Sequence, residues 1–333
     1  MKYIHVDSLN IFFRATHTAH RAADLWAKIG LALHINLASV NSVVQRFGAD
    51  HVTISTEGRS WRKDYYPQYK KNREVDRDAQ TETEREEAAM LFEAYQAMIE
   101  FFKTKTNVSV LHHPIAEADD QIARFIALHP DDEHTIISSD TDFYQLLSPT
   151  VRIYNGITNE MITHDGVFTD AGKPVFDRKT KQHKKIGDPK WVLFEKCIRG
   201  DSTDNVFSAY PGVREKGSKN TVGLREAFAD KDKKGYAWNA VMLARWTDHL
   251  EVEHKVIDDY NRNVVLVDLA AQPIEIRNQI DDNLRSVLRS AQPVGGVGMH
   301  FLKFCGKYDL KKLSDNPAAF ASWLNKPYQG VLK

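Results

Sequence analysis

The chain has 333 residues, enough for two domains of ordinary size, and its 42% hydrophobic residues can build sizeable cores. Its 45 acidic and 45 basic residues balance, so no global field indicates a nucleic-acid partner and local patches must do so. Cys197 and Cys305 are its only cysteines, a number that gives no disulfide framework or zinc knuckle and fits a reducing compartment. The apolar start is too short for a signal peptide, and no apolar run approaches the length of a membrane span. We therefore expect a cytoplasmic protein with no membrane contact.

The first half of the chain alternates β-type runs with helical patterns. The strands are predicted at residues 3–6, 52–55, 108–111 and 135–138, and the helices at 25–47, 82–103 and 121–128. Strands separated by helices favour an α/β fold whose central, mostly parallel sheet is flanked by helices on both faces.

The helix over 82–103 shows the clearest periodicity. Its apolar residues recur at i, i+3, i+4 and i+7, namely Ala88, Leu91, Phe92, Tyr95, Met98, Ile99 and Phe102, and the aromatic ones among them are predicted to lie in the core. The acidic run 82–87 is typical of a first helical turn, where carboxylates meet the positive end of the helix dipole.

The character of the chain changes between residues 155 and 189. Turn residues and β-type pairs there predict a hairpin around 172–176, and the basic segment 178–185 is either a contact for duplex backbone or an exposed loop. Beyond it, residues 191–198 have a helical pattern, and the Gly-rich passage 211–223 leads to further helices. We place the domain boundary here, with one domain over 1–189 and a second over 190–333.

Carboxylates follow each of the four predicted strands. Asp7 ends the first strand and Glu57 follows the second, and the remaining acids follow the third and fourth: Glu117, Asp119, Asp120, Asp140 and Asp142. The carboxyl ends of parallel strands meet at one edge of a sheet, so these acids are expected on one rim. Asp7 taken alone is more typical of a helix N-cap, but seven carboxylates exceed what capping requires. Asp201 and Asp204 add two acids after a later helix, where either one alone would be a turn residue.

An all-oxygen set of this size indicates hard divalent cations. Mg²⁺ or Mn²⁺ is held by a few carboxylates together with water and substrate phosphate, and this many acids implies two ions. Two ions about 3.5–4 Å apart activate water and stabilise the leaving oxygen of a phosphodiester. The crowded carboxylates of residues 116–120 are then explained by the cations they hold.

A basic and aromatic segment follows Glu57 directly. Residues 59–73 interleave six basic residues with four aromatic ones, and cations for phosphates with ring faces for bases are the ingredients of single-strand binding. The expected contacts are Arg59, Arg62, Lys63, Tyr69 and Lys71. Lys216 and Lys219 in the Gly-rich passage, where backbone amides could approach a phosphate, are further candidates.

Five motifs in order resemble the phage and bacterial 5′ nucleases, the family of flap endonucleases, 5′ to 3′ exonucleases and phage enzymes called RNase H. They are Asp7 after a strand, the segment 61–73, residues 117–120, residues 139–142 and residues 200–205. The resemblance runs to about residue 269, and the chain beyond residue 271 has no motif of its own.

The resemblance implies a PIN-like nuclease domain, with a helical arch over about 61–105 and a helix-three-turn-helix DNA-binding motif over 201–228. It implies that Asp7, Glu57, Glu117 and Asp119 hold one metal ion, with Asp120 near both ions. Asp140, Asp142, Asp201 and Asp204 would hold the other. Lys70 and Arg73 would contact the scissile phosphate and stabilise charge that grows in the transition state.

The implied activity is Mg²⁺-dependent hydrolysis of DNA at 5′ flaps, nicks or free 5′ ends, and of RNA–DNA hybrid primers, during replication and repair. Mn²⁺ would substitute for Mg²⁺, K⁺ would bind at the helix-three-turn-helix motif as in some relatives, and replication proteins would be partners. If the chain is phage-encoded, it would act in the host cytoplasm. Two departures bear on this: Glu57 stands where the family usually has Asp, and Ser218, Lys219 and Asn220 are atypical of the second glycine turn.

Three other functions compete with this one. A metal-dependent phosphatase usually has Asp-x-Asp after its first strand, whereas Asp7 is followed by Ser8 and Leu9. A non-catalytic DNA-binding protein on a decayed nuclease scaffold would have lost carboxylates, but the expected positions are acidic. A toxin-like RNA nuclease of related fold would lack the module after Trp191.

Overall fold

The computed structural model describes residues 1–19 and 22–332, and these form two compact units. Unit 1 contains Met1–Ser60, Gln80–Lys185 and Glu275–Lys333, and unit 2 contains Trp61–Ala79 and Ile186–Ile274. The described residues do not include 20, 21 and 333, which belong to the expected segments 1–189 and 190–333. The compact units interleave along the chain, whereas two consecutive segments were expected.

Unit 1 is built on a seven-stranded sheet, counted over the described residues, with the strand order β3-β2-β1-β4-β5-β6-β7. The strands are β1 (Lys2–Asp7), β2 (His51–Ser55), β3 (Ser109–Leu111), β4 (Glu133–Ile137), β5 (Val151–Asn155), β6 (Glu160–Thr163) and β7 (Gly166–Thr169). The neighbouring strands β3, β2, β1, β4 and β5 pair in parallel. Strands β6 and β7 extend the sheet from β5 in antiparallel pairs. The predicted, mostly parallel sheet is confirmed, and β5 to β7 extend it beyond the four expected strands.

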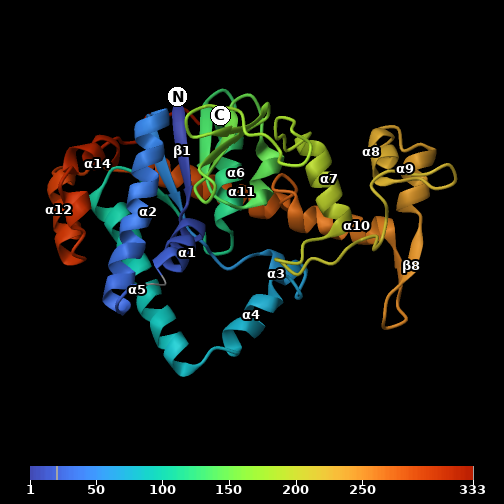
Figure 1. Ribbon diagram of the computed structural model, residues 1–333, viewed down its shortest axis with the longest axis horizontal. Coiled ribbons are helices and arrows are strands. Elements are labelled where there is room, and N and C mark those ends of the chain that lie inside the picture. The colour runs from blue at the N-terminus through green and yellow to red at the C-terminus, as the bar shows by residue number, and fades with distance from the viewer. Residues whose placement is uncertain (20–21, 333) are drawn as a thin grey trace. The chain divides into compact units, whose positions relative to one another are not determined.

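Helices cover both faces of this sheet (Figure 1). The unit contains α1 (Ser8–Thr18), α2 (Leu25–Phe47), α5 (Glu82–Lys105), α6 (Ala118–Leu128), the short 3₁₀ helix η2 (Thr141–Leu146), α11 (Ile274–Ser290), α12 (Val297–Lys307), α13 (Lys311–Ser314) and α14 (Pro317–Leu324). Ile4 and Val6 on β1 pack in a core with α1, α2, α5, α12 and α14, while Tyr3 packs on the other face with α6 and α11. This alternation follows from the two-residue period of a strand buried on both faces.

Helix α5 begins where the acidic run predicts. Thr81 is its N-cap, and the Glu84 carboxylate accepts a hydrogen bond from the Thr81 backbone N–H at 2.8 Å. Tyr95 and Phe102 are buried in the core as predicted, and Met98 is buried with them. Phe92 is different, because 46% of its surface is exposed. The prediction that Phe92 is a core residue was wrong, although its neighbours Met90 and Leu91 pack against the core.

Helix α2 corrects a second prediction. By length and composition alone it could cross a membrane, with a mean hydropathy of 1.2 over its most apolar 18-residue window. The statement that no apolar run approaches this length was therefore wrong. The helix is apolar because Ile29, Leu33, Leu37 and Val40 are buried in the unit 1 core.

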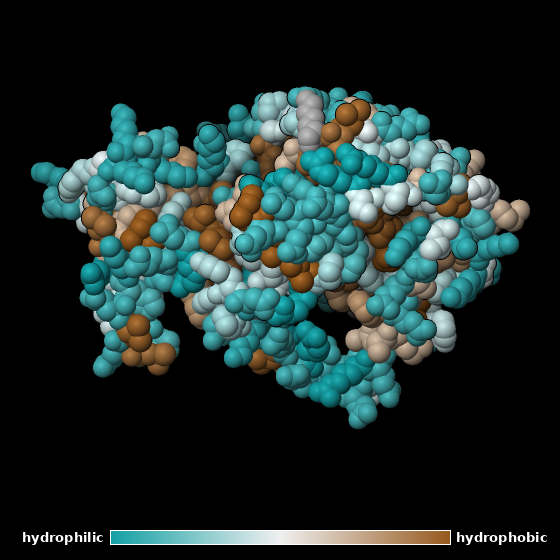
Figure 2. All heavy atoms as spheres, turned by 180° about the vertical axis from the view of Figure 1, so that it is seen from behind, coloured by the Kyte–Doolittle hydropathy of each residue, from teal (hydrophilic) through white to brown (hydrophobic). Residues whose placement is uncertain are grey.

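On the face that Figure 2 shows, hydrophilic residues dominate and hydrophobic residues form small groups between them.

Four buried histidines lie on the sheet face that packs against α6 and the C-terminal segment. His5 shares hydrogen bonds with Thr53 at 2.8 Å and with His134 at 3.0 Å. His51 is 3.0 Å from the Lys326 carbonyl oxygen, and His129 is 2.6 Å from the Tyr328 hydroxyl. These bonds tie residues 326–328 to β2 and to the end of α6.

Unit 2 has its own core, formed around Trp191, Phe194, Trp238 and Tyr260. Its elements are α3 (Arg62–Tyr65), α4 (Lys71–Asp78), α7 (Pro189–Arg199), α8 (Leu224–Ala229), α9 (Tyr236–Met242), the β8 (Arg245–Thr247) and β9 (Glu253–Lys255) ribbon, and α10 (Val256–Val267). The predicted helix over 191–198 is confirmed by α7. A long loop with several turns joins α7 to α8, in the segment where the resemblance implies a helix-three-turn-helix motif.

Candidate functional site

The acid that ends β1 lies at the carboxyl edge of the sheet. Asp7 is paired in register with Ser55 at the end of β2, and Ser55 is paired with Leu111 at the end of β3. The Asp7 carboxylate is 6% exposed and accepts a hydrogen bond from the Ser138 hydroxyl at 2.8 Å. It makes no side-chain cap to α1, so the N-cap interpretation of Asp7 was wrong.

Glu57 is held at the same edge by a close approach of two backbones. The Gly58 N–H donates to the Ala116 carbonyl at 2.9 Å, and a Cβ at Gly58 would lie 2.0 Å from the His113 carbonyl oxygen. Only glycine fits this crossing. It brings the Glu57 carboxylate to the start of α6, where it accepts from the Ala118 N–H at 3.2 Å.

Three carboxylates gather at the first turn of α6. One oxygen from each of Glu117, Asp119 and Asp120 lies within 4.8 Å of the others, and Glu117 and Asp120 are buried. The helix start offers partial compensation: the Asp120 N–H donates to Asp119 at 2.7 Å, and the Glu117 N–H donates to Asp120 at 3.3 Å. Buried like charges at this spacing repel, so a cation among them would be strongly favoured. The donor set is all oxygen and fits Mg²⁺ or Mn²⁺.

The end of β4 brings two further acids in the same unit. Asp140 caps η2 by accepting from the Asp142 N–H at 2.9 Å, and the Asn10 side chain accepts from the Ser139 N–H at 3.1 Å. Thus α1 holds the loop that carries both aspartates.

Several residues that support this rim were not predicted as site residues. Ser8 and Tyr95 share a hydrogen bond of 2.6 Å, and burial raises the pKa of Tyr95, which the charges of Glu57 and Asp7 raise further. Ser138 and Asn10 contact the rim as described above. A usable signal was present, because Ser8, Asn10 and Ser138 are polar residues placed directly beside the ends of β1 and β4.

The remaining two acids lie in unit 2, in the loop after α7. Gly200 ends α7 with φ +76°, and a Cβ there would lie 2.3 Å from the Val206 carbonyl oxygen. Asp201 accepts from the Thr203 N–H at 2.8 Å and forms an ion pair with Lys196 at 2.7 Å. Burial would raise the pKa of Asp201, but Lys196 and Thr203 outweigh it and hold that pKa below its usual range. Asp201 is thus a turn residue, as the alternative interpretation had it, and a carboxylate that stays ionised.

Asn263 of α10 fixes this loop from both sides. Its buried amide donates to the Cys197 and Phe207 carbonyls, each at 2.8 Å. This contact gives a physical reason for the segment 260–269 that the sequence resemblance included.

Lys70 and Arg73 both converge on Asp204. The Lys70 Nζ is 3.5 Å from one carboxylate oxygen, the Arg73 guanidinium is 2.6 Å from the other, and the Tyr69 hydroxyl donates at 3.0 Å. Lys70 itself has φ +54° and precedes the first turn of α4. Lys70 and Arg73, which are expected to contact the scissile phosphate, therefore both lie beside Asp204, one of the predicted metal ligands.

The basic and aromatic segment divides into buried and exposed parts. Arg62 is 1% exposed and donates to the Leu266 carbonyl at 2.8 Å, and Tyr69 is 3% exposed. Direct contacts of Arg62 and Tyr69 with nucleic acid are contradicted by this burial, since both side chains hold the segment onto its own unit. Lys63 pairs with Glu74 at 2.6 Å, while Arg59 and Lys71 are exposed.

The Gly-rich passage also has an internal role. The Gly217 and Gly223 N–H groups donate to the Glu226 carboxylate at 3.0 and 2.9 Å, so these amides are not free to bind a phosphate. Lys216 and Lys219 are exposed, as is most of the basic loop 178–185 in unit 1.

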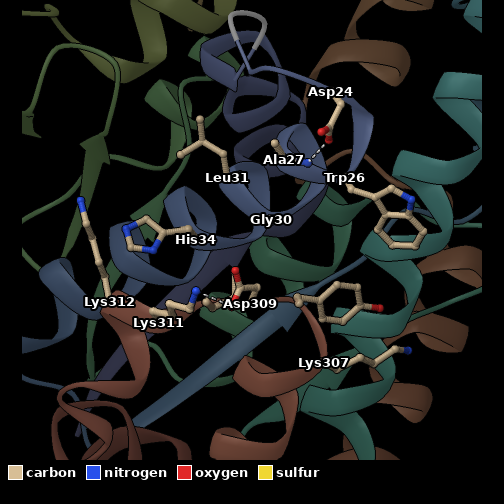
Figure 3. Close-up of a pocket in the computed structure, with 12 residues that line it drawn as sticks. Asp24, Trp26, Ala27, Gly30, Leu31, His34, Lys307, Asp309, Lys311 and Lys312 are labelled. Carbon is tan, nitrogen blue, oxygen red and sulfur yellow. Dashed lines mark hydrogen bonds and ion pairs between the residues drawn. The ribbon is translucent and has the colours of Figure 1, made fainter.

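A separate cavity of about 640 Å³ lies in unit 1 between α2 and the segment from Lys307 to Lys312. Figure 3 shows Trp26, Leu31 and His34 along one wall and the lysines along the other. None of the predicted site residues lines it. Its place in the unit gives no reason to connect it with the acidic rim.

Comparisons with known proteins identify the family. Residues 2–172 match the model of the 5′-3′ exonuclease N-terminal resolvase-like domain. The chain is 28% identical over 242 residues to the flap endonuclease Xni of Shewanella loihica, which covers 70% of this chain and 82% of that protein. It is 24% identical over 229 residues to the flap endonuclease of Escherichia phage T5, which covers 68% of this chain and 69% of that protein.

It is also 26% identical over 231 residues to DNA polymerase I of Rhizobium leguminosarum, where the match covers 69% of this chain but only 19% of the polymerase. The chain thus spans about a fifth of that relative's length.

Solved structures agree on the fold. The T5 D15 protein co-crystallised with metal ions superposes with a TM-score of 0.59 at 20% identity, covering 88% of this chain and all of that one. A T5 5′-exonuclease with bound zinc gives a TM-score of 0.58 at 20% identity, covering 86% of this chain and 99% of that one. The family model spans just over half of the chain, including all seven strands of the sheet and the acids from Asp7 to Asp142, and the chain therefore belongs to the 5′-3′ exonuclease family of 5′ nucleases.

Proposed function

We propose that the chain is a Mg²⁺-dependent, structure-specific 5′ nuclease that hydrolyses phosphodiesters at 5′ flaps, nicks and free 5′ ends, and removes RNA primers in DNA replication and repair. One observation carries the proposal: Glu117, Asp119 and Asp120 offer carboxylate oxygens within 4.8 Å of one another, while Asp7 ends β1 and Glu57 follows the neighbouring parallel strand β2. The flap endonucleases among the relatives support the choice of substrate.

The proposed metal ligands follow the two groups of acids. Asp7, Glu57, Glu117 and Asp119 would hold one ion, and Asp140, Asp142, Asp201 and Asp204 the other, with Asp120 near both. Two Mg²⁺ ions supply an activated water and stabilise the leaving oxygen, and Mn²⁺ meets the same requirements. The longer Glu57 is compatible with this role, because Gly58 draws its backbone toward the start of α6.

Lys70 and Arg73 are proposed to act on the scissile phosphate. Both pair with Asp204, so they are positioned before substrate arrives. A phosphate that competes with Asp204 for these cations would receive two donors preorganised for the charge that develops in the transition state. Arg59 and Lys71 are exposed and would contact the backbone of the 5′ strand, as would Lys216 and Lys219 along a duplex.

The K⁺ ion at the helix-three-turn-helix segment and the replication partners are proposed from the resemblance to the 5′ nucleases. RNA primers are supported by the chemistry, since hydrolysis by this acidic set does not require a deoxyribose.

The test compares one duplex with a labelled 5′ flap and the same duplex with a 3′ flap. We expect Mg²⁺-dependent, chelator-sensitive cleavage of the 5′ flap near its junction, and the 3′ flap should stay intact. The electron paramagnetic resonance signal of Mn²⁺ measures metal binding without any turnover. We expect Asp120→Asn to weaken this binding. Tight flap binding without cleavage in Mg²⁺ or Mn²⁺ would instead indicate a non-catalytic DNA-binding protein.

A further inference from the structure

A second cavity in unit 1 opens beside the acidic rim. It has a volume of about 530 Å³ and lies between α5 and α11, above the ends of β2 and β3. Its apolar lining comes from Leu9, Phe92, Tyr95, Ile99, Val110 and Val287. This α5–α11 cavity falls within the range of about 300–1,000 Å³ found for small-molecule sites. Glu57 lines it too, so the cavity is continuous with the proposed catalytic edge.

The charges on its wall do not attract a phosphate. Glu57 is proposed to hold a metal ion, and the rest of the wall carries the Glu100 carboxylate and the Lys103 ammonium group. An anionic ligand would meet no net positive charge there, whereas a flat, neutral ligand would lose only its contact with water.

Asn283 provides a specific polar contact in this wall. Its Oδ1 is buried and, within the described residues, accepts no hydrogen bond. A buried acceptor without a donor is costly, so a ligand N–H at this place would be favoured. Nucleobases carry such N–H groups on a flat apolar ring.

Phe92 supplies a stacking surface. It lines the cavity, is 46% exposed, and stacks on Tyr95 with ring centroids 5.8 Å apart and planes at 27°. Tyr95 is buried and fixed by its hydrogen bond to Ser8, so it supports the Phe92 ring from behind. The exposed face of the Phe92 ring can therefore bind a base, because bases of any sequence stack on aromatic faces.

We propose that the α5–α11 cavity receives one unstacked nucleobase of the substrate strand, next to the phosphate that is cleaved. The proposal rests on the nuclease function above. It adds a base-binding site that involves α11, a helix in the part of the chain without a sequence motif. The backbone phosphates stay outside at the rim, where the cations are expected, and the neutral base enters the cavity.

The test is a double-mutant cycle between protein and substrate. Flap affinity is measured in chelator, so that no cleavage occurs, for wild type and Phe92→Ala on substrates that carry one abasic site at each position around the junction. For wild type we expect one position where loss of the base weakens binding about 5- to 100-fold. Phe92→Ala should weaken the intact substrate similarly and lose the dependence on that base.

Two further variants sharpen the result. Val287→Trp fills the cavity from α11 and should reproduce the effect of Phe92→Ala without touching α5. Phe176→Ala removes another exposed phenylalanine of unit 1, 59% exposed and outside the cavity, and should behave as wild type. Circular dichroism checks that each variant is folded.

Each outcome decides between the two proposals. If wild type cleaves the 5′ flap but no abasic position couples to Phe92, the base site is wrong and the nuclease function stands. If wild type neither cleaves nor binds flaps, the nuclease function is wrong and the base site falls with it.

Discussion

The buried histidines predict that unit 1 loses stability in mild acid. Burial lowers the pKa of His51 and of His134 to about 4, from an ordinary value of 6.5. The pKa of His5 is lowered as well, first by its burial and then by the neighbouring histidines. All three are neutral in the folded protein at pH 7, and their protonation opposes folding.

The sign follows from proton binding. Below pH 6.5, His51 and His134 bind protons in the unfolded chain but stay neutral in the folded protein. The histidines therefore cost no stability above pH 6.5, and the free energy of unfolding falls as the pH drops toward 4. At pH 5 the loss is about 2 kcal/mol for each of these two histidines, or about 4 kcal/mol together. Because a domain of this kind is stable by only about 5–15 kcal/mol, the effect is large.

Urea unfolding followed at pH 5.0 and pH 7.5 measures this difference. Hydrogen exchange of the β1 and β2 amides reports on unit 1 separately. The control is His51→Gln, which keeps a polar side chain but cannot ionise, and it should reduce the difference between the two pH values by about 2 kcal/mol. An equal loss in wild type and variant would refute the assignment to His51.

Four further outcomes are expected. Asp142→Ala should abolish flap cleavage and leave flap binding, measured by gel shift, largely intact; unchanged turnover would remove Asp142 from the site. Lys70→Ala should lower the single-turnover rate by about 100- to 1,000-fold, and a loss of affinity with an unchanged rate would contradict its action on the transition state. Gly58→Ala should weaken Mn²⁺ binding, because a Cβ 2.0 Å from the His113 carbonyl must displace Glu57, and normal Mn²⁺ binding would show that Glu57 is not a ligand. Arg62→Ala should cost about 1–3 kcal/mol in urea unfolding by leaving the Leu266 carbonyl without its donor, and an intact midpoint with weaker DNA binding would restore the surface role.

The sequence pattern alone was sufficient to predict the elements whose residue types have one common structural role. The strand and helix periods predicted β1 to β4, α2, α5 and α7, because strands buried on both faces and helices with an apolar stripe carry their periods in the sequence. The order of acids after the strands predicted their place on one edge, since strands in a parallel sheet share their direction. The sequence therefore determined the fold class and the family.

Side-chain environments required the tertiary structure. Arg62 and Tyr69 have the same residue types as surface DNA contacts, and only the packing of unit 2 shows them buried against Leu266 and Asp204. Phe92 has the helical spacing of a core residue, yet 46% of its surface is exposed and it lines the α5–α11 cavity.

Contacts between distant segments decided the rest. The acids of α6 approach Glu57 because a glycine at position 58 lets two backbones cross, and Asn283 reaches the α5–α11 cavity from a segment without any motif. Sequence period reports which face of an element is apolar, but it does not report what another part of the chain places on that face. For this protein the chemistry of the acidic edge was determined by the sequence, and the surroundings of that edge were decided by tertiary packing.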